Sequence, residues 1–272
     1  MKHLSIFERY MPILLFLYCL FPLYIVVSAS LKGPAQLFLD PFGLPKGIHF
    51  KNYVDAWRVG NLARAFRNSG ILTLGTILGV LITALPTAYA LAKIRFPGEK
   101  FLMGYFFFCM TIPPQLFLVP LYYMFAKLGL TNSLGGLILI YIARWSPFSI
   151  LLWRSYFMEI PGELVEAALV DGASRWQAFR RIVLPIFRPG IVTVIVIVAM
   201  WSWNEFLFPL TFLHKAGLEP VTVALAMFRG RWSAAWGPMM AAAISGALPI
   251  IALFALLHRR FIAGLARTGL KG

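Results

Sequence analysis

Six long apolar stretches constrain the fold of this chain more than any other feature of its sequence. They cover residues 11–31, 69–92, 101–126, 134–154, 190–212 and 238–258. Each has close to the roughly 20 apolar residues that an α-helix needs to cross a bilayer. The sequence therefore predicts an all-α, polytopic membrane protein with six transmembrane helices.

The composition agrees with a membrane protein. Hydrophobic residues make up 60% of the chain and charged residues only 13%, whereas a soluble domain carries about a quarter charged residues. The net charge of +15 comes from short basic clusters between the apolar stretches. Contact with anionic lipid and a positive-inside topology explain such clusters without nucleic acid. Cys19 and Cys109 lie within apolar stretches and lack metal-ligand spacing.

The distribution of Lys and Arg predicts the orientation. An even number of spans places both termini on one side, and that side carries fourteen basic residues against ten on the other. The bias predicts cytoplasmic termini. Lys2 and Arg9 precede the first apolar stretch as in a signal peptide, but this stretch is longer than the usual 7–15 residues. We therefore expect an uncleaved anchor.

A charge-rich amphipathic segment, EAALVDGASRWQAFRRIVLP, separates the fourth and fifth spans. Pro161 suits a first helical position, and Gly172 is expected to end the first of two short helices. Ser174 with Gln177 forms a capping box that starts the second helix, and Pro185 is expected to stop it. The first helix is acidic and the second basic, so the segment predicts an elbow that is presented to a partner. The alternative is an amphipathic loop that only lies on the headgroups.

Seven residues of this elbow stand at fixed spacing: Glu166, Ala167, Ala168, Gly172, Ile182, Leu184 and Pro185. The pattern resembles the cytoplasmic EAA loop in permease subunits of binding-protein-dependent ABC importers. The resemblance implies a type I ABC importer permease fold in a bacterial or archaeal cytoplasmic membrane. It also implies that these residues couple the chain to a separate ATPase, with Ala168 on the surface that faces this partner. The further partners implied are a second permease, in a heterodimer, and an extracytoplasmic solute-binding protein.

The resemblance extends beyond the elbow. It divides the chain into residues 1–67, a transmembrane core at 68–258 with the coupling loop at 156–189, and a cytoplasmic tail at 259–272. Residues 52–67 are expected to include a short interfacial helix. The tail resembles the ending of the maltose-type second permease of sugar importers, although Ala266 stands where that pattern has Thr.

Polar residues within the spans are candidates for the solute path. Prolines flank Gln115 in the third span, and a break there faces either the pathway or a packing neighbour. Trp203, Asn204 and Glu205 combine an aromatic ring with hydrogen-bonding groups, which suits sugar recognition. The alternative for Glu205 is an ion pair with a sister subunit. For Arg144, snorkelling to an interface is favoured over a buried partner.

The sequence predicts no catalytic, cofactor-binding or metal site. It has no Gly-Lys dipeptide, hence no P-loop, and no HExxH motif. We therefore expect that the chain is not an enzyme and that a partner hydrolyses ATP. The predicted function is the import of a sugar or oligosaccharide. A non-sugar solute, an ion-gradient carrier with Glu205 as its only candidate buried carboxylate, and a non-transporting scaffold are the alternatives.

Overall fold

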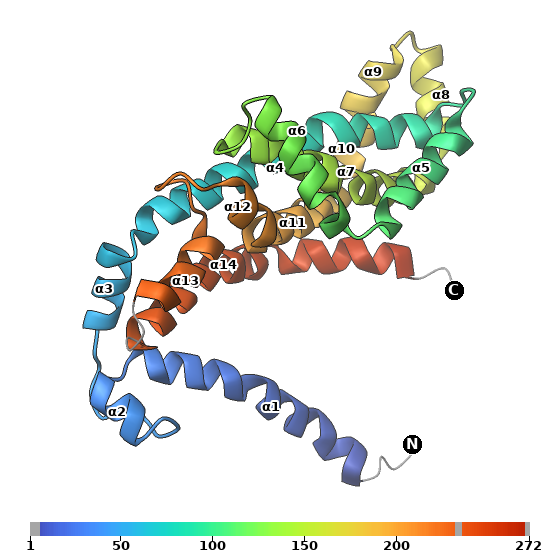
Figure 1. Cartoon of the computed structure of the whole chain (residues 1–272). Helices are drawn as coiled ribbons and strands as arrows, with labels where there is room; N and C mark the ends of the chain where they lie inside the picture. The colour runs from blue at the N-terminus through green and yellow to red at the C-terminus, as the bar shows by residue number, and fades with distance from the viewer. Residues whose placement is uncertain (1–5, 232–235, 270–272) are drawn as a thin grey trace. The chain divides into compact units, whose positions relative to one another are not determined.

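The computed structural model describes the backbone of residues 6–231 and 236–269, and all regular elements in these ranges are helices (Figure 1). The predicted all-α class is confirmed. The first half contains α1 (Ile6–Ser30), α2 (Pro34–Leu39), α3 (Lys51–Val59), α4 (Leu62–Lys93), α5 (Glu99–Thr111), the 3-10 helix η1 (Pro114–Phe117), α6 (Leu118–Lys127) and α7 (Leu134–Glu159). The second half contains α8 (Gly162–Val170), α9 (Arg175–Ala178), the π-helix η2 (Phe179–Val183), α10 (Leu184–Ile186), α11 (Arg188–Asn204), α12 (Leu207–Phe212), α13 (Val221–Arg231) and α14 (Trp236–Gly269).

Four of the described helices are long and apolar enough to cross a membrane, namely α1, α4, α7 and α14. The number rises to six if each of two bent helix pairs counts as one span. The break expected at the prolines of the third stretch, 101–126, is confirmed, and α5 and the η1–α6 segment meet there at 91°. Ile112 is extended, with φ −83° and ψ 124°, since a residue before proline is kept out of the helical region.

The fifth predicted span, 190–212, differs from the structure. Helix α11 ends at Asn204, and Glu205 is extended with φ −67° and ψ 129°. Residues 207–212 then form the separate short helix α12. Hydropathy alone missed this break because the residues on both sides of it are apolar.

The chain forms two compact units, the first of which contains residues 1–66 and 221–249. Its core joins α3, the start of α4, α13 and α14 through five buried side chains: Ala56, Leu62, Phe228, Ala241 and Ala242. A short helix is expected within 52–67; the structure has α3 there, which ends at Val59, and residues from Leu62 onward belong to α4. The interfacial position of α3 stays a prediction.

The second unit contains residues 67–220 and 250–272 and carries the elbow. Its helices α4 and α7 approach closely because glycine stands twice on the α4 surface. A Cβ added to Gly75 would lie 2.6 Å from Ile138 Cδ1, and one added to Gly79 would lie 2.0 Å from Ile142 Cδ1. This small-xxx-small spacing is a common way to pack helices in membranes.

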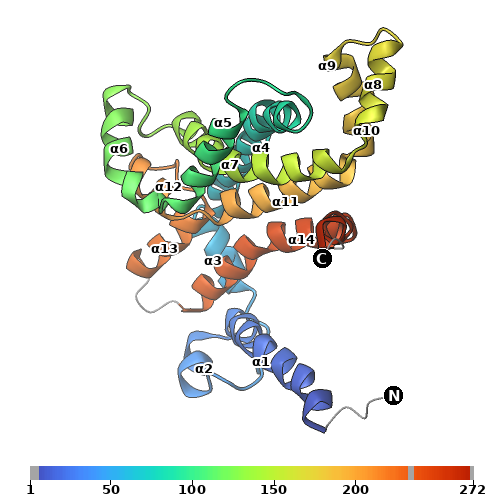
Figure 2. The ribbon, with the colours of Figure 1, turned by 90° about the vertical axis from the view of Figure 1, so that its right-hand side faces the viewer.

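Figure 2 shows α8 and α9 as a hairpin at one end of this second unit. The tail pattern named above falls partly on residues 270–272, which lie outside the described residues.

Candidate functional site

The bend between α8 and α9 is a glycine-dependent helix terminus. Gly172 has φ +85°, a left-handed conformation that L-residues other than glycine rarely adopt. The Ala173 amide donates to Ala168 O at 2.9 Å, and the Gly172 amide donates to Leu169 O at 3.1 Å. Together these two bonds form a Schellman motif. The prediction that Gly172 ends the first helix is therefore confirmed.

The second helix of the elbow starts as predicted and ends later. The Gln177 amide donates to Ser174 Oγ at 3.2 Å, and the Ser174 amide donates to Gln177 Oε1 at 2.7 Å. This is the predicted capping box. Pro185 does not stop the helix, because α10 continues from η2 through Pro185 to Ile186. Pro161 precedes α8 as its N-cap instead of beginning it.

One face of the elbow is anchored in the core of the second unit. Val165, Ala168, Phe179 and Val183 are buried there together with aromatic residues of α4 and α7. The Phe179 ring lies 4.6 Å from the ring of Tyr89 in α4, measured between centroids. The expectation that Ala168 faces the partner is wrong, because only 6% of this residue is exposed.

Two cations add polar ties at the base of the elbow. Lys93, the last residue of α4, donates through Nζ to the Ile160 carbonyl, just before α8. Arg154 of α7 donates through Nε to Leu91 O at 3.1 Å and pairs with Glu99 at 3.4 Å. The ends of α4, α5 and α7 are thus linked to one another and to the elbow. From the sequence alone, these cations indicate only the topology.

The opposite face of the elbow exposes apolar side chains. Val170 is 87% exposed and Trp176 is 59% exposed. Leu164 and Leu169 are also exposed, beside the exposed residues Glu166 and Ala167. Large apolar side chains on a charged loop indicate a surface that a partner protein or the membrane covers. Of the remaining motif residues, Ile182 and Leu184 pack partly against the core, and Pro185 is exposed.

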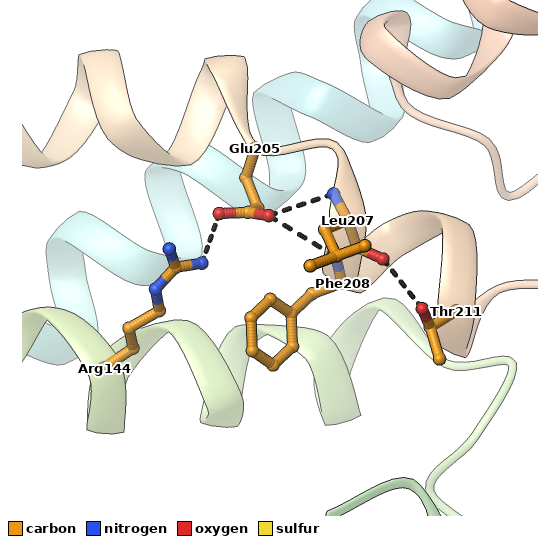
Figure 3. A network of polar contacts seen from close by, with 5 residues as sticks. All are labelled: Arg144, Glu205, Leu207, Phe208 and Thr211. Carbon is orange, nitrogen blue, oxygen red and sulfur yellow. Dashed lines mark hydrogen bonds and ion pairs between the residues drawn. The ribbon is translucent and has the colours of Figure 1, made fainter. Parts of the chain in front are cut away.

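A second polar site lies within the apolar helices (Figure 3). Arg144 of α7 forms an ion pair with Glu205, and their side chains are 21% and 10% exposed. Glu205 Oε1 also accepts hydrogen bonds from the Leu207 amide at 3.0 Å and from the Phe208 amide at 3.4 Å. Glu205 therefore satisfies the first amides of α12, where the helix would otherwise leave them unpaired.

Aromatic rings surround the guanidinium of Arg144. Its carbon Cζ lies 4.2 Å from the ring centroid of Trp145 and 5.0 Å from that of Phe208. The favoured snorkelling interpretation of Arg144 is wrong, because the side chain has an anionic partner and two rings within the same unit. An unmatched Arg and an unmatched Glu in separate apolar stretches were the sequence signals for this pair.

The predicted solute-path residues have different surroundings. Trp203 is buried at 9% exposure, and Glu205 is held in the pair just described. Asn204 is exposed at the end of α11, where its Nδ2 donates to Met200 O at 2.8 Å. Gln115 is exposed in η1, at the break between α5 and α6.

Comparison with known families gives the elbow its context. Residues 75–267 match the family described as "Binding-protein-dependent transport system inner membrane component". The chain belongs to this family. It is accordingly a permease component of the inner membrane rather than an enzyme.

Relatives of the chain are similar over nearly its full length. A probable ABC transporter permease, YurM of Bacillus subtilis, is 36% identical and aligns over 96% of this chain and 87% of its own. The diacetylchitobiose uptake permease NgcG of Streptomyces coelicolor is 32% identical, over 91% of this chain and 82% of its own. The melibiose/raffinose/stachyose import permease MelC of Bacillus subtilis is 33% identical, over 92% of this chain and 91% of its own.

Among solved structures, a chain of a bacterial ABC transporter that imports the acidic polysaccharide alginate has the same fold. The two share 23% identity with a TM-score of 0.82, over 96% of this chain and 100% of the other. This likeness confirms the predicted importer permease fold.

Proposed function

We propose that this chain is one of two permease subunits in an ATP-driven importer of a sugar or oligosaccharide. In this proposal an ATPase dimer binds the elbow on the cytoplasmic side, and a solute-binding protein delivers the solute from outside. The family membership supports the transporter class. The names of relatives such as MelC and NgcG, which specify oligosaccharide uptake, support the solute class.

The structure of the elbow is the main support for an ATPase partner. Its inner face is held in the core by Val165 and Phe179, whereas its tip exposes Val170 and Trp176. A partner that binds the tip can therefore move α8 and α9 together with the ends of α4 and α7. This arrangement is what a coupling element between a motor and a set of spans requires.

The test is a charge placed on the tip without disturbing the fold. Val170→Lys suits the C-terminal end of α8, where a cation is favourable toward the helix dipole. We expect normal amounts of protein, loss of the ATPase during co-purification and loss of ATP-driven uptake. Ala216→Lys, at an exposed position in the 213–220 loop, is the matched control and should behave like the parent. Retention of the ATPase and of uptake in Val170→Lys would refute docking at this tip.

Within the predicted solute path, we infer that Gln115 and Asn204 contact the solute and that Glu205 acts on the helix break. The exposure of the two amides and the ion pair of Glu205 support this division. Gln115→Ala and Asn204→Ala should raise the KM for uptake with little change in protein stability. A lowered melting temperature with unchanged KM would assign them to structure instead.

The ion-gradient alternative has less support, because its one candidate carboxylate is paired with Arg144. Liposomes that contain only this chain should show no uptake of labelled oligosaccharide under a proton or sodium gradient. Uptake under these conditions would replace the importer proposal by a carrier.

A further inference from the structure

The segment between α1 and α3 folds back along α1 instead of extending away from it (Figure 1). The hydroxyl of Tyr24 donates to Phe42 O at 3.0 Å, and the hydroxyl of Ser28 donates to Gly43 O at 3.0 Å. The ring of Phe42 stacks on the ring of Phe21, with centroids 6.4 Å apart and planes inclined by 17°. Residues 40–44 therefore run beside the C-terminal turns of α1.

Side-chain hydrogen bonds hold this fold-back in place. Lys32 is fully buried, and its Nζ donates to Asp40 O at 3.0 Å and to Pro41 O at 2.9 Å. Gln36 of α2 donates through Nε2 to Leu44 O at 2.8 Å. A buried ammonium that binds two carbonyls would leave all three groups unsatisfied if the segment moved away. The conformation is therefore a specific part of the fold.

The segment directs large apolar side chains away from the protein. We call residues 34–50 the apolar wedge; its exposed members are Phe38, Leu39, Phe42, Leu44, Ile48 and Phe50, each between 63% and 86% exposed. Loops in water rarely carry so many exposed large apolar side chains together. Something apolar must cover this surface.

The position of the wedge along α1 identifies what covers it. Helix α1 is an apolar span from Tyr10 to Ser30, and Tyr24 lies six residues before its end. At 1.5 Å per residue this places the Phe42 carbonyl about 9 Å below the end of the helix. Interfacial elements insert their apolar faces about 5–10 Å into the boundary between headgroups and acyl chains. The exposed side chain of Lys46 can extend from this depth to the headgroups.

We propose that the apolar wedge inserts into one leaflet of the membrane and contacts lipid acyl chains. The leaflet is the one at the C-terminal end of α1, and only its description as the outer leaflet rests on the proposed function. The wedge would fix the depth and tilt of α1, because Phe21, Tyr24 and Ser28 of α1 contact it directly.

Spin labels on single cysteines test this proposal in the assembled transporter, reconstituted in phosphatidylethanolamine–phosphatidylglycerol liposomes. The background carries Cys19→Ser and Cys109→Ser, and the test label replaces Phe42 or Leu44. The ratio of collisions with oxygen to collisions with a water-soluble nickel chelate reports depth. Leu23→Cys, at an exposed position of α1 close to the same level, is the lipid reference. Lys215→Cys, exposed in the 213–220 loop, is the water reference.

We expect the ratio at Phe42 and Leu44 to match that at Leu23 and to exceed that at Lys215 severalfold. A ratio equal to that at Lys215 would place the wedge in water and overturn the proposal. Exclusion of both reagents would mean that a protein, such as the sister permease, covers the wedge, and would equally overturn it. Either result would leave ATPase docking at the elbow untouched.

A second set of variants tests the hydrogen bonds that hold the wedge. Tyr24→Phe removes the donor to Phe42 O, and Ser28→Ala removes the donor to Gly43 O. In the double variant the ratio at the Phe42 label should fall toward the water reference. Tyr18→Phe, at a tyrosine of α1 that is 78% exposed, is the matched control and should leave the ratio unchanged. No change in the double variant would show that these bonds do not set the depth.

Discussion

Gly172 is the residue on which the elbow depends most directly. Its φ of +85° alone makes a substitution costly, since a Cβ at this position would meet no atom within 4 Å. The role of this glycine was predictable because helices commonly end at a residue in the left-handed conformation, which is usually glycine. Because an added Cβ meets no neighbour, a substitution at Gly172 tests backbone conformation without changing side-chain packing.

We predict that Gly172→Val costs about 1–3 kcal/mol in the elbow and abolishes ATP-driven uptake while the spans stay folded. Asparagine tolerates the left-handed region better than valine, so Gly172→Asn should keep part of the uptake. Uptake and ATPase co-purification measure the elbow, and the melting temperature of the solubilised complex measures the spans. Equal activity of the valine variant and the parent would make the elbow a passive linker.

The ion pair between Arg144 and Glu205 was not predictable by residue type alone. The two residues are 61 positions apart, and no local pattern links α7 to the end of α11. Hydropathy shows that each charge is costly within a span, but it does not identify the partner. The contact with the α12 amides was equally hidden, because the helix break at Glu205 lies in an apolar sequence.

A double-mutant cycle measures this pair. Arg144→Met and Glu205→Gln should each destabilise the chain, because each leaves the other charge in a largely buried site. The double variant should be more stable than the sum of the single losses implies, with a coupling energy of about 0.5–3 kcal/mol. Glu205→Gln keeps an oxygen for the Leu207 amide, so it tests the charge rather than the cap. If the losses of stability in the single variants simply add up in the double variant, measured by denaturant or thermal unfolding, the two residues are not energetically coupled.

At the scale of helices, short sequence motifs predicted correctly where a helix begins or ends. They predicted less well whether a helix continues through a proline. The capping box at Ser174 and the terminus at Gly172 form through neighbouring residues, so the sequence contains them completely. Whether Pro185 ends a helix depends on its surroundings, and the chain around it is helical from Phe179 to Ile186. The size of the bend at Pro113, 91°, likewise needed the structure.

The two faces of α8 give a matched prediction. Ala168→Asp would bury a carboxylate in the core beneath the elbow and should cost about 3 kcal/mol or more. Ala167→Asp adds the same group one position away on the exposed face and should leave stability nearly unchanged. Thermal unfolding of the solubilised chain compares the two. Similar melting temperatures for both variants would mean that the elbow is not anchored through Ala168.

At the scale of the whole chain, topology depends on the two bent helix pairs. If α5 and α6 together cross the membrane, residues 94–98 and 128–133 lie on opposite sides. If they instead enter and leave on one side, every later loop changes sides, and the elbow moves away from the side of the N-terminus. Counting apolar stretches cannot distinguish these topologies, whereas the excess of basic residues beside the elbow favours the crossing.

Cysteines labelled from outside intact cells decide between these topologies. In a background without Cys19 and Cys109, we expect a membrane-impermeant maleimide to label Lys127→Cys and Lys215→Cys directly. Lys100→Cys and Arg175→Cys should react only after the membrane is permeabilised, because the proposed topology places them in the cytoplasm. All four positions are exposed in the structure, so the absence of labelling reports the side of the membrane rather than burial. If Lys100→Cys and Lys127→Cys react alike, the α5–α6 pair is re-entrant and only five spans remain. The elbow would then lie on the opposite side of the membrane from the N-terminus, and its access to a cytoplasmic ATPase would have to be established anew.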